Sequence, residues 1–318
     1  MKRKEFIQAT AISSLALTIP MIRAFGRDFP GQYQLPKRVL GSTGEKVSAI
    51  AFGGIMLNDN PQDFANEIVA KAWEMGVNYY DIAPGYGNAQ EKLGPALKPY
   101  REKAFLACKT GRRDAAGAKA ELEDSLRKLE TGYFELYQLH AINSVEDVEK
   151  AFGEKGAMKT FIRAKEEGQV KYLGFSAHSV AAALRAMELY PFDTAMFPIN
   201  FAAWSAGDFG PQIFDLAEKK KMGIIALKAM ALTLNQPRDT PYDKNVWYRP
   251  ITNDKLMDMA LRFSLSKNIA TAIPPGKSTL FFKALEIMKT YKPVTPSEIS
   301  QLEALAARTI PVFSNKST

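Results

Sequence analysis

The sequence predicts an α/β fold of the (β/α)₈ TIM-barrel type, and three observations carry this prediction. First, eight short apolar runs of strand length recur along the chain, as in strands that are buried on both faces. Second, segments with apolar residues at three- and four-residue spacing separate these runs, as amphipathic helices would. Third, the 318 residues, 46% of them hydrophobic, have room for a barrel of roughly 250 residues and its core.

Strands covered by helices on both faces form parallel sheets, and eight such units are the number that closes into a barrel. The predicted strands are residues 49–54, 77–83, 104–110, 134–140, 170–177, 194–200, 223–229 and 269–275. The predicted helices include residues 63–76, 118–130, 160–168, 180–190, 213–223 and 254–268. We therefore expect one closed ring of strands with helices around it.

Two further elements flank the eight units. Two short alternating runs around a Gly-Ser-Thr-Gly turn, within residues 37–54, predict a β-hairpin that leads into the first strand. Residues 295–309 open with an N-cap signal and predict an extra C-terminal helix. A doubly wound open sheet is the alternative, but no Gly-x-Gly-x-x-Gly follows the first strand. No linker divides residues 35–318, so we predict a single barrel domain there.

The first 28 residues differ from the rest of the chain. A basic head precedes an apolar, small-residue stretch at residues 9–22, as in an export signal. Residues 2–11 resemble a twin-arginine leader in which Lys4 follows Arg3 where a second arginine is expected, with Phe6 in its usual place. Residues 1–28 thus predict an export signal or a disordered leader, contact with export machinery and a periplasmic location. The location is cytoplasmic if the leader does not function.

Composition narrows the partners. The net charge is +8, of which the leader holds +3, and the remaining lysines are scattered except at Lys219–Lys221, so no nucleic-acid partner is expected. No run after the leader reaches the ~18 apolar residues of a membrane span. A single cysteine, Cys108, excludes an internal disulfide. With only two histidines besides, we expect no zinc site.

Four polar side chains of unlike kinds stand where predicted strands end. Asp81 and Tyr86 lie in the bend YYDIAPGYGN after the second strand, Lys109 closes the third and His140 closes the fourth. The carboxyl ends of barrel strands and the loops that follow them form the active site in this fold. Since the strand interiors are otherwise apolar, we expect the four side chains to meet at the barrel mouth.

These four residue types suit proton transfer to a carbonyl group. A lysine ammonium beside a tyrosine favours the phenolate and lowers the pKa of the hydroxyl from about 10 toward working pH. Asp81 would hold Lys109 charged and in place. Tyr86 would exchange a proton with the substrate oxygen while His140 donates a hydrogen bond to it. No activated serine or cysteine is present, so the hydride would come from a cofactor.

The bend DIAPGYG resembles the Asp-x-Ala-x-x-Tyr-Gly signature of the aldo-keto reductases, and Lys109 and His140 stand where that family has its lysine and histidine. The resemblance runs from about Arg38 to about Met288. It implies a (β/α)₈ barrel, reversible reduction of a small carbonyl compound to an alcohol, and NADP(H) held extended across the mouth, with NAD(H) as the alternative.

The resemblance also implies cofactor contacts. Ser176 and Asn200 would hold the carboxamide, although Ala177 replaces the asparagine that usually follows the serine, and Lys228 would contact the pyrophosphate. Phe281 stands where an arginine for the 2′-phosphate is common, so the preference for NADP over NAD is weak. The segment that resembles the adenosine-phosphate site contributes Pro274, Gly276, Lys277 and Ser278.

His178, Trp204 and Trp247 are candidates for the substrate pocket, since long loops over a barrel mouth often carry specificity, with ordinary loop packing as the alternative.

Two other functions stay open. One is an exported sugar dehydrogenase or epimerase with a tightly bound NAD. The other is a regulatory subunit that binds the cofactor without turnover.

Overall fold

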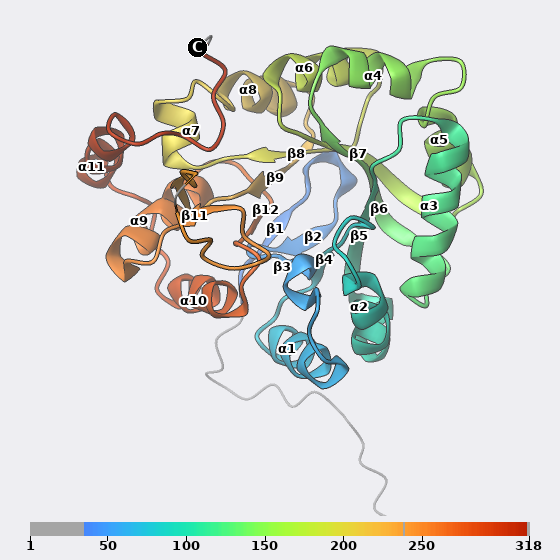
Figure 1. Ribbon diagram of the computed structural model, residues 1–318, viewed down its shortest axis with the longest axis horizontal. Helices are drawn as coiled ribbons and strands as arrows, with labels where there is room; N and C mark the ends of the chain where they lie inside the picture. The colour runs from blue at the N-terminus through green and yellow to red at the C-terminus, as the bar shows by residue number, and fades with distance from the viewer. Residues whose placement is uncertain (1–34, 238, 317–318) are drawn as a thin grey trace, which may run out of the picture. The chain divides into compact units, whose positions relative to one another are not determined.

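The computed structural model describes residues 35–237 and 239–316, and the predicted leader at residues 1–28 lies outside them. Within the described residues, eight parallel strands form one sheet with helices around it (Figure 1). In sheet order the strands are β3 (Phe52–Gly53), β4 (Tyr79–Asp81), β5 (Phe105–Thr110), β6 (Phe134–Ile142), β7 (Val170–Ala177), β8 (Thr194–Pro198), β9 (Gly223–Leu227) and β12 (Thr271–Ile273). Each lies within a predicted strand or overlaps it.

The sheet closes into a barrel through the residues just before β3. Ala51 N–H donates a hydrogen bond to the carbonyl oxygen of Ala272 on β12 at 2.9 Å, and Ala272 N–H donates to the carbonyl oxygen of Ala49 at 2.9 Å. Ile50 and Ala272 form a parallel bridge between these bonds. The (β/α)₈ prediction is therefore confirmed over the open sheet, because the two ends of the sheet meet at this bridge.

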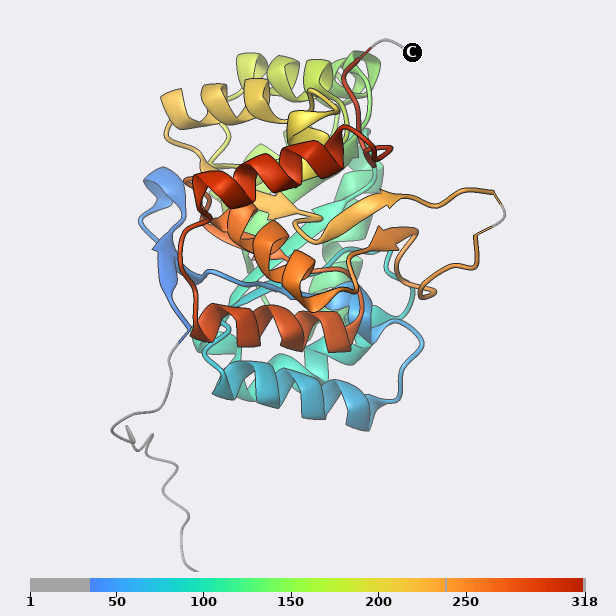
Figure 2. The same cartoon turned by 90° about the vertical axis from the view of Figure 1, so that its left-hand side faces the viewer.

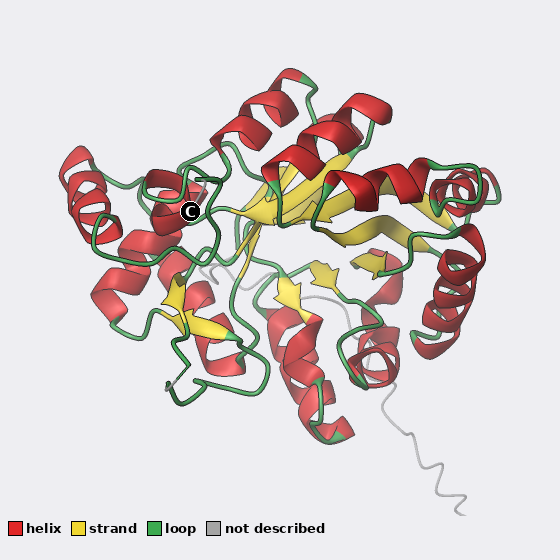
Figure 3. Cartoon of the chain, turned by 45° about the horizontal axis from the view of Figure 1, so that its top comes forward, coloured by secondary structure: helices red, strands yellow, loops and turns green. Residues whose placement is uncertain are grey.

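The helices lie outside the strands, as Figure 3 shows with the helices in red. They are α1 (Gln62–Glu74), α2 (Ala89–Leu97), α3 (Ala115–Lys128), α4 (Val145–Phe152), α5 (Met158–Glu166), α6 (Val180–Leu189), α7 (Phe201–Ser205), α8 (Pro211–Lys219), α9 (Asp254–Leu265), α10 (Ser278–Lys289) and α11 (Pro296–Ala306), with short 3₁₀ segments η1 (Gly41–Thr43), η2 (Gly54–Leu57) and η3 (Lys98–Lys103). The predicted extra C-terminal helix is α11, and Thr295 and Glu298 form a capping box at its start. No helix in residues 35–237 and 239–316 is long and apolar enough to span a membrane.

Helix α2 is one that apolar periodicity does not indicate, because it contains Gly94 and Pro95, both weak helix formers. Packing explains the glycine. A Cβ at Gly94 would lie 2.5 Å from the carbonyl oxygen of Lys128, the last residue of α3. The close approach of two helices thus outweighs local propensity.

Two hairpins lie at opposite ends of the barrel (Figure 2). The predicted hairpin, β1 (Lys37–Val39) and β2 (Lys46–Ser48), covers the amino ends of the strands, where Leu40 and Val47 are fully buried against the barrel interior. The second hairpin, β10 (Ala231–Leu234) and β11 (Tyr248–Pro250), follows β9 on the side of the mouth. One end of the barrel is therefore closed by apolar side chains, and the other stays available for a site.

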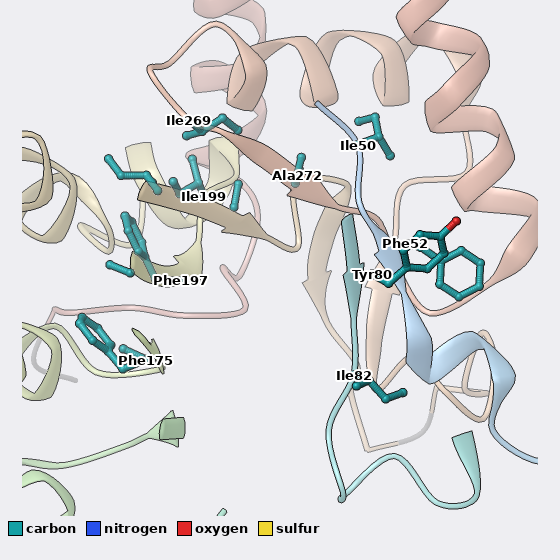
Figure 4. Packing of buried hydrophobic residues seen from close by; sticks show 14 of the residues in the cluster. Ile50, Phe52, Tyr80, Ile82, Phe175, Phe197, Ile199, Ile269 and Ala272 are labelled. Carbon is teal, nitrogen blue, oxygen red and sulfur yellow. The ribbon is translucent and has the colours of Figure 1, made fainter. Parts of the chain in front are cut away.

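Alternate strand positions divide the core into two parts. Inward-facing side chains such as Tyr79, Phe105, Leu136 and Ile225 fill the barrel itself. Outward-facing side chains pack against the helices, and Figure 4 shows several of them: Phe52, Tyr80, Ile82, Phe175 and Phe197. The packed interior makes the barrel a rigid support for residues at the strand ends.

We predict that Gly174→Ala destabilises the barrel. Gly174 pairs with Thr194, and a Cβ on it would lie 2.1 Å from Thr194 Oγ1 and 3.0 Å from the Thr194 carbonyl oxygen, both in the packed sheet. Overpacking of this kind costs about 1–3 kcal/mol of unfolding free energy. Chemical denaturation should show a lower midpoint for Gly174→Ala. The matched control is Gly132→Ala, whose added methyl meets nothing within 4 Å. Equal midpoints for the two variants would contradict the prediction.

Candidate active site

Asp81 and Lys109 form a buried ion pair at the mouth of the barrel. Lys109 Nζ donates a hydrogen bond to Asp81 Oδ2 at 2.5 Å and to the carbonyl oxygen of Ile82 at 3.1 Å. The two side chains are 3% and 1% exposed, respectively. Burial is the largest single influence on the pKa of Lys109 and lowers it, but the charges of Asp81 and Tyr86 and the hydrogen bond to Asp81 together outweigh burial and raise the pKa. The ammonium is therefore held charged although its side chain is buried.

Tyr86 lies in the loop after β4, beside this pair. Lys109 Nζ is 5.4 Å from the centroid of the Tyr86 ring. Burial raises the pKa of the Tyr86 hydroxyl, and the Lys109 ammonium opposes this rise without cancelling it. The sequence led us to expect a lowered pKa, and the structure differs because desolvation of the phenolate is the larger effect. Tyr86 is thus a neutral phenol near pH 7, which suits a proton donor.

His140 completes the group of four, which we call the tetrad: Asp81, Tyr86, Lys109 and His140. The ring centroids of His140 and Tyr86 are 5.8 Å apart, with the planes at 84°. Burial, followed by the positive charges around the mouth, lowers the pKa of His140 to about 3. The imidazole is therefore neutral near pH 7 and carries one N–H that can donate to a substrate oxygen.

A bulge in β6 holds His140 at the mouth. The pairing of β6 with β7 shifts register directly after Leu139, and Ala141 has a left-handed backbone with φ 51°. Ala141 N–H donates to Ser176 Oγ at 2.7 Å, and Arg113 Nη2 donates to the carbonyl oxygen of His140 at 2.8 Å. The backbone on both sides of the His140 side chain is therefore fixed by hydrogen bonds to neighbouring elements.

A cleft of about 420 Å³, which we call the tetrad cleft, opens beside Asp81 and Tyr86, the two tetrad residues that line it. The loop after β4, the end of β9, the β10–β11 hairpin and the end of β12 all contribute to its wall. Asp81, Tyr86, Lys228, Trp247, Pro274 and Gly276 line it. The structure thus brings residues predicted for catalysis, for cofactor binding and for substrate binding around one cavity.

Asn200 and Ser176, the residues implied for a carboxamide, are both fully buried. Asn200 is the N-cap of α7, where its Oδ1 accepts a hydrogen bond from Ala203 N–H at 2.9 Å. Its Nδ2 is buried and has no partner among the described residues, and neither Asn200 nor Ser176 is among the residues that line the cleft beside Tyr86. Ser176 Oγ serves the β6 bulge as an acceptor, and its own proton remains available to a ligand.

Lys228 and His178 meet at the mouth. Lys228 Nζ lies 3.5 Å from His178 Nε2. Burial and the charge of Lys109 lower the pKa of Lys228 to about 8, and burial, with the charge of Lys228, lowers the pKa of His178 to about 3. Near pH 7 the ammonium is therefore the donor and the neutral imidazole the acceptor.

The segment after β12 reaches the cleft at Pro274 and Gly276. Lys277 instead pairs with Asp243 at 2.7 Å, so a carboxylate already offsets its charge. Ser278 is the first residue of α10, and backbone N–H groups at such a helix start attract phosphate. The residues implied for the adenosine phosphate are thus close to the cleft, but the cation among them has a protein partner.

The two tryptophans predicted for the substrate pocket lie in different places. Trp247 lines the cleft and is 53% exposed. Trp204 lines a groove between α7 and α11, where its ring packs edge-on against Phe214 at 5.6 Å and Lys267 Nζ lies 3.8 Å from the ring centroid. Local packing thus accounts for Trp204, and the structure does not bring it to the tetrad cleft.

Phe313 lies near the mouth, and no sequence pattern indicates this position. It stacks on His178 with ring centroids 4.7 Å apart, and Lys228 Nζ lies 5.1 Å from its centroid. Hydrogen bonds from Asn315 N–H and Ser314 Oγ to the carbonyl oxygen of Gly207 anchor the segment around it. The sequence around Phe313 has no apolar periodicity, so only the tertiary contacts show that this segment lies at the barrel mouth.

No group of three or more His, Cys, Asp or Glu side chains in the described part of the chain is arranged to hold a metal ion.

A barrel with this tetrad at its mouth is the arrangement that the aldo-keto reductase resemblance implies. The model of the aldo/keto reductase family matches residues 49–302. The chain therefore belongs to that family, whose members are oxidoreductases that use a nicotinamide cofactor.

Named relatives agree with this assignment. The chain is 30% identical over 213 residues to a probable aldo-keto reductase 1 of Glycine max, covering 61% of this chain and 59% of that protein, so the match spans little more than half of the relative. It is 23% identical over 273 residues to an L-galactose dehydrogenase of Arabidopsis thaliana, covering 76% and 84% of the two chains.

Solved structures share the fold. An aldo-keto reductase of Bacillus halodurans in its holo form matches with a TM-score of 0.69 at 21% identity, covering 88% of this chain and 99% of that chain. An aldo-keto reductase of Klebsiella pneumoniae in complex with NADPH matches with a TM-score of 0.67 at 14% identity, covering 90% and 99%. At these identities the likeness supports the barrel alone.

We predict that Asp81→Asn destabilises the protein through Lys109. The substitution leaves the buried ammonium without a counter-charge, which costs about 3–5 kcal/mol of unfolding free energy. Denaturant melts should show the loss. The double variant Asp81→Asn/Lys109→Met removes the uncompensated ammonium. It should therefore recover much of the lost free energy of unfolding, which a double-mutant cycle would measure. A double variant no more stable than Asp81→Asn would argue against the charge as the cause.

Proposed function

We propose that this protein interconverts an aldehyde or ketone with the corresponding alcohol, using NADP(H) as the hydride carrier. The observation that carries the proposal is the meeting of the tetrad beside a cleft at the barrel mouth. Family membership supports the reaction class. The NADPH complex of the Klebsiella protein, a structural relative, supports the choice of cofactor.

In the direction of reduction, Tyr86 donates its hydroxyl proton to the carbonyl oxygen as negative charge develops there. The neutral His140 donates a hydrogen bond to the same oxygen. Lys109 provides positive charge next to the phenolate that Tyr86 becomes, and Asp81 keeps Lys109 charged. A reduced nicotinamide bound in the cleft supplies the hydride.

Several observations fit a nicotinamide cofactor. The buried, unpartnered Nδ2 of Asn200 is suited to the oxygen of a carboxamide, and Ser176 Oγ retains a proton to donate. The start of α10, next to the cleft residues Pro274 and Gly276, is suited to a phosphate. The chain's own residues therefore offer contacts for both ends of an extended dinucleotide.

We predict that Tyr86→Phe abolishes turnover while cofactor binding remains. Loss of a positioned proton donor lowers rates by about 10²- to 10⁴-fold. The measurement is NADPH oxidation with a panel of aldehydes, ketones and sugars, together with NADPH affinity from fluorescence. Tyr133→Phe is the matched control, because this exposed tyrosine packs on Arg101, away from the tetrad.

Each outcome of this experiment separates the candidates. Turnover in the wild type that Tyr86→Phe loses supports the reductase. NADPH binding without turnover of any compound in the wild type would favour the regulatory subunit and overturn the proposal. Turnover confined to sugars with a cofactor that stays bound through purification would favour the sugar dehydrogenase.

We predict that Asn200→Ser weakens NADPH binding about fivefold to tenfold, as expected for one lost hydrogen bond. The serine hydroxyl preserves an oxygen to cap α7, whereas the amide donor Nδ2 is lost. Affinity is measured by titration of the protein with NADPH, and thermal melts of the free protein monitor the cap. Unchanged affinity in a folded variant would remove Asn200 from the cofactor site.

A further inference from the structure

The positive charges around the tetrad cleft are not equally compensated. Lys109 pairs with Asp81 at 2.5 Å, Lys277 with Asp243 at 2.7 Å, and Lys244 with Asp59 at 3.6 Å. Lys228 lines the same cleft but makes no ion pair with a carboxylate of the described residues. A partly buried ammonium without an anion is costly, so the position of Lys228 calls for a ligand that supplies the charge.

The surroundings of Lys228 hold its ammonium in place without neutralising it. His178 Nε2 accepts from Nζ at 3.5 Å, and the ring centroids of Trp247 and Phe313 lie 5.6 Å and 5.1 Å from Nζ. Imidazole and aromatic faces orient a cation but carry no net charge. Lys228 also has a left-handed backbone with φ 58°, a conformation that costs a non-glycine residue roughly 1 kcal/mol and is retained mainly where function requires it.

Lys228 Nζ contacts His178 and not the segment implied for the adenosine phosphate, although Pro274 and Gly276 of that segment line the same cleft. In the ring of strands β9 lies between β8 and β12, and the segment implied for the adenosine phosphate follows β12. Lys228 instead reaches past β8 to His178, which follows β7. This is the side of the mouth where β6 presents His140, and the charge of Lys228 is among those that depress the pKa of His140.

We propose that Lys228, oriented by His178 and enclosed by Trp247 and Phe313, binds an anionic group of the substrate, so that this protein acts on carbonyl compounds that carry a carboxylate. This inference rests on the proposed function, because the anion is placed relative to a carbonyl held by Tyr86 and His140. Lys228 thus determines substrate specificity, and the carboxylate of the substrate supplies the negative charge that no side chain of the described residues provides to its ammonium.

The test compares benzaldehyde with its 2-, 3- and 4-carboxy derivatives as substrates, which share a ring and differ in the reach of the carboxylate. In the wild type, kcat/KM for one carboxy isomer should exceed that for benzaldehyde. Lys228→Met should lower this ratio by about tenfold or more, as expected for a lost charged hydrogen bond. Lys228→Arg, which keeps the charge, should retain much of the preference. Lys220→Met is the matched control, because Lys220 is exposed at the opposite end of the β9 unit.

A second arm identifies the source of the anion. NADPH affinity should be the same in the wild type and Lys228→Met. If Lys228→Met weakens NADPH binding and slows all four aldehydes alike, the ammonium binds a cofactor phosphate and the proposal is overturned. An unchanged ratio of carboxylated to neutral aldehyde in Lys228→Met would also overturn it.

A third arm does not depend on turnover. Calorimetric titration with isophthalate and terephthalate should show binding to the wild type that Lys228→Met loses and Lys228→Arg keeps. Such binding would support the anion subsite even if no aldehyde is reduced, in which case only the proposed reaction fails. If neither dicarboxylate binds the wild type and no carboxy isomer is preferred, the subsite does not exist.

Discussion

The arrangement of the active site depends on the buried ion pair between Asp81 and Lys109. Each residue alone would be too costly to bury as an ion, and the 2.5 Å contact makes their joint burial tolerable. The neighbouring strands β4 and β5 hold the backbones of the two residues in place. The Lys109 ammonium is therefore kept in position by its contact with Asp81. The proton chemistry proposed for Tyr86 therefore has a fixed positive charge beside it before any substrate arrives.

The same burial determines the charge state of the other two members of the tetrad. Desolvation raises the pKa of Tyr86 and lowers that of His140, so both groups are neutral near pH 7 and both carry a proton that can be donated. In the proposed reaction, two neutral donors next to one fixed ammonium would stabilise a developing oxyanion without holding a strong negative charge of their own. The protonation states of these residues thus support the proposed reaction as much as their placement does.

The sequence was sufficient for the parts of the molecule that depend on local pattern. Eight apolar runs predicted the barrel, and polar residues at their ends predicted that Asp81, Tyr86, Lys109 and His140 would come together, because parallel strands place such ends on one rim. Other features depend on packing between distant segments. Gly94 and Pro95 weaken the helical pattern of α2, so the sequence did not predict this helix. The bulge after His140 has no local signature. Residue type alone could not show that Trp247 lies at the cleft and Trp204 does not. The net effect on the pKa of Tyr86 was also beyond sequence, because it is a balance between burial and charge.

The final turn of the chain contributes to the mouth in a way that bears on how this protein can change. Phe313 belongs to none of the eight barrel units and is held mainly through Gly207 and the aromatic contacts of its ring. Evolution or design could alter it without disturbing the strands or the pairing of Asp81 with Lys109. Because Phe313 lies outside the eight barrel units, this part of the mouth can be altered while the strands that hold the tetrad keep their packing.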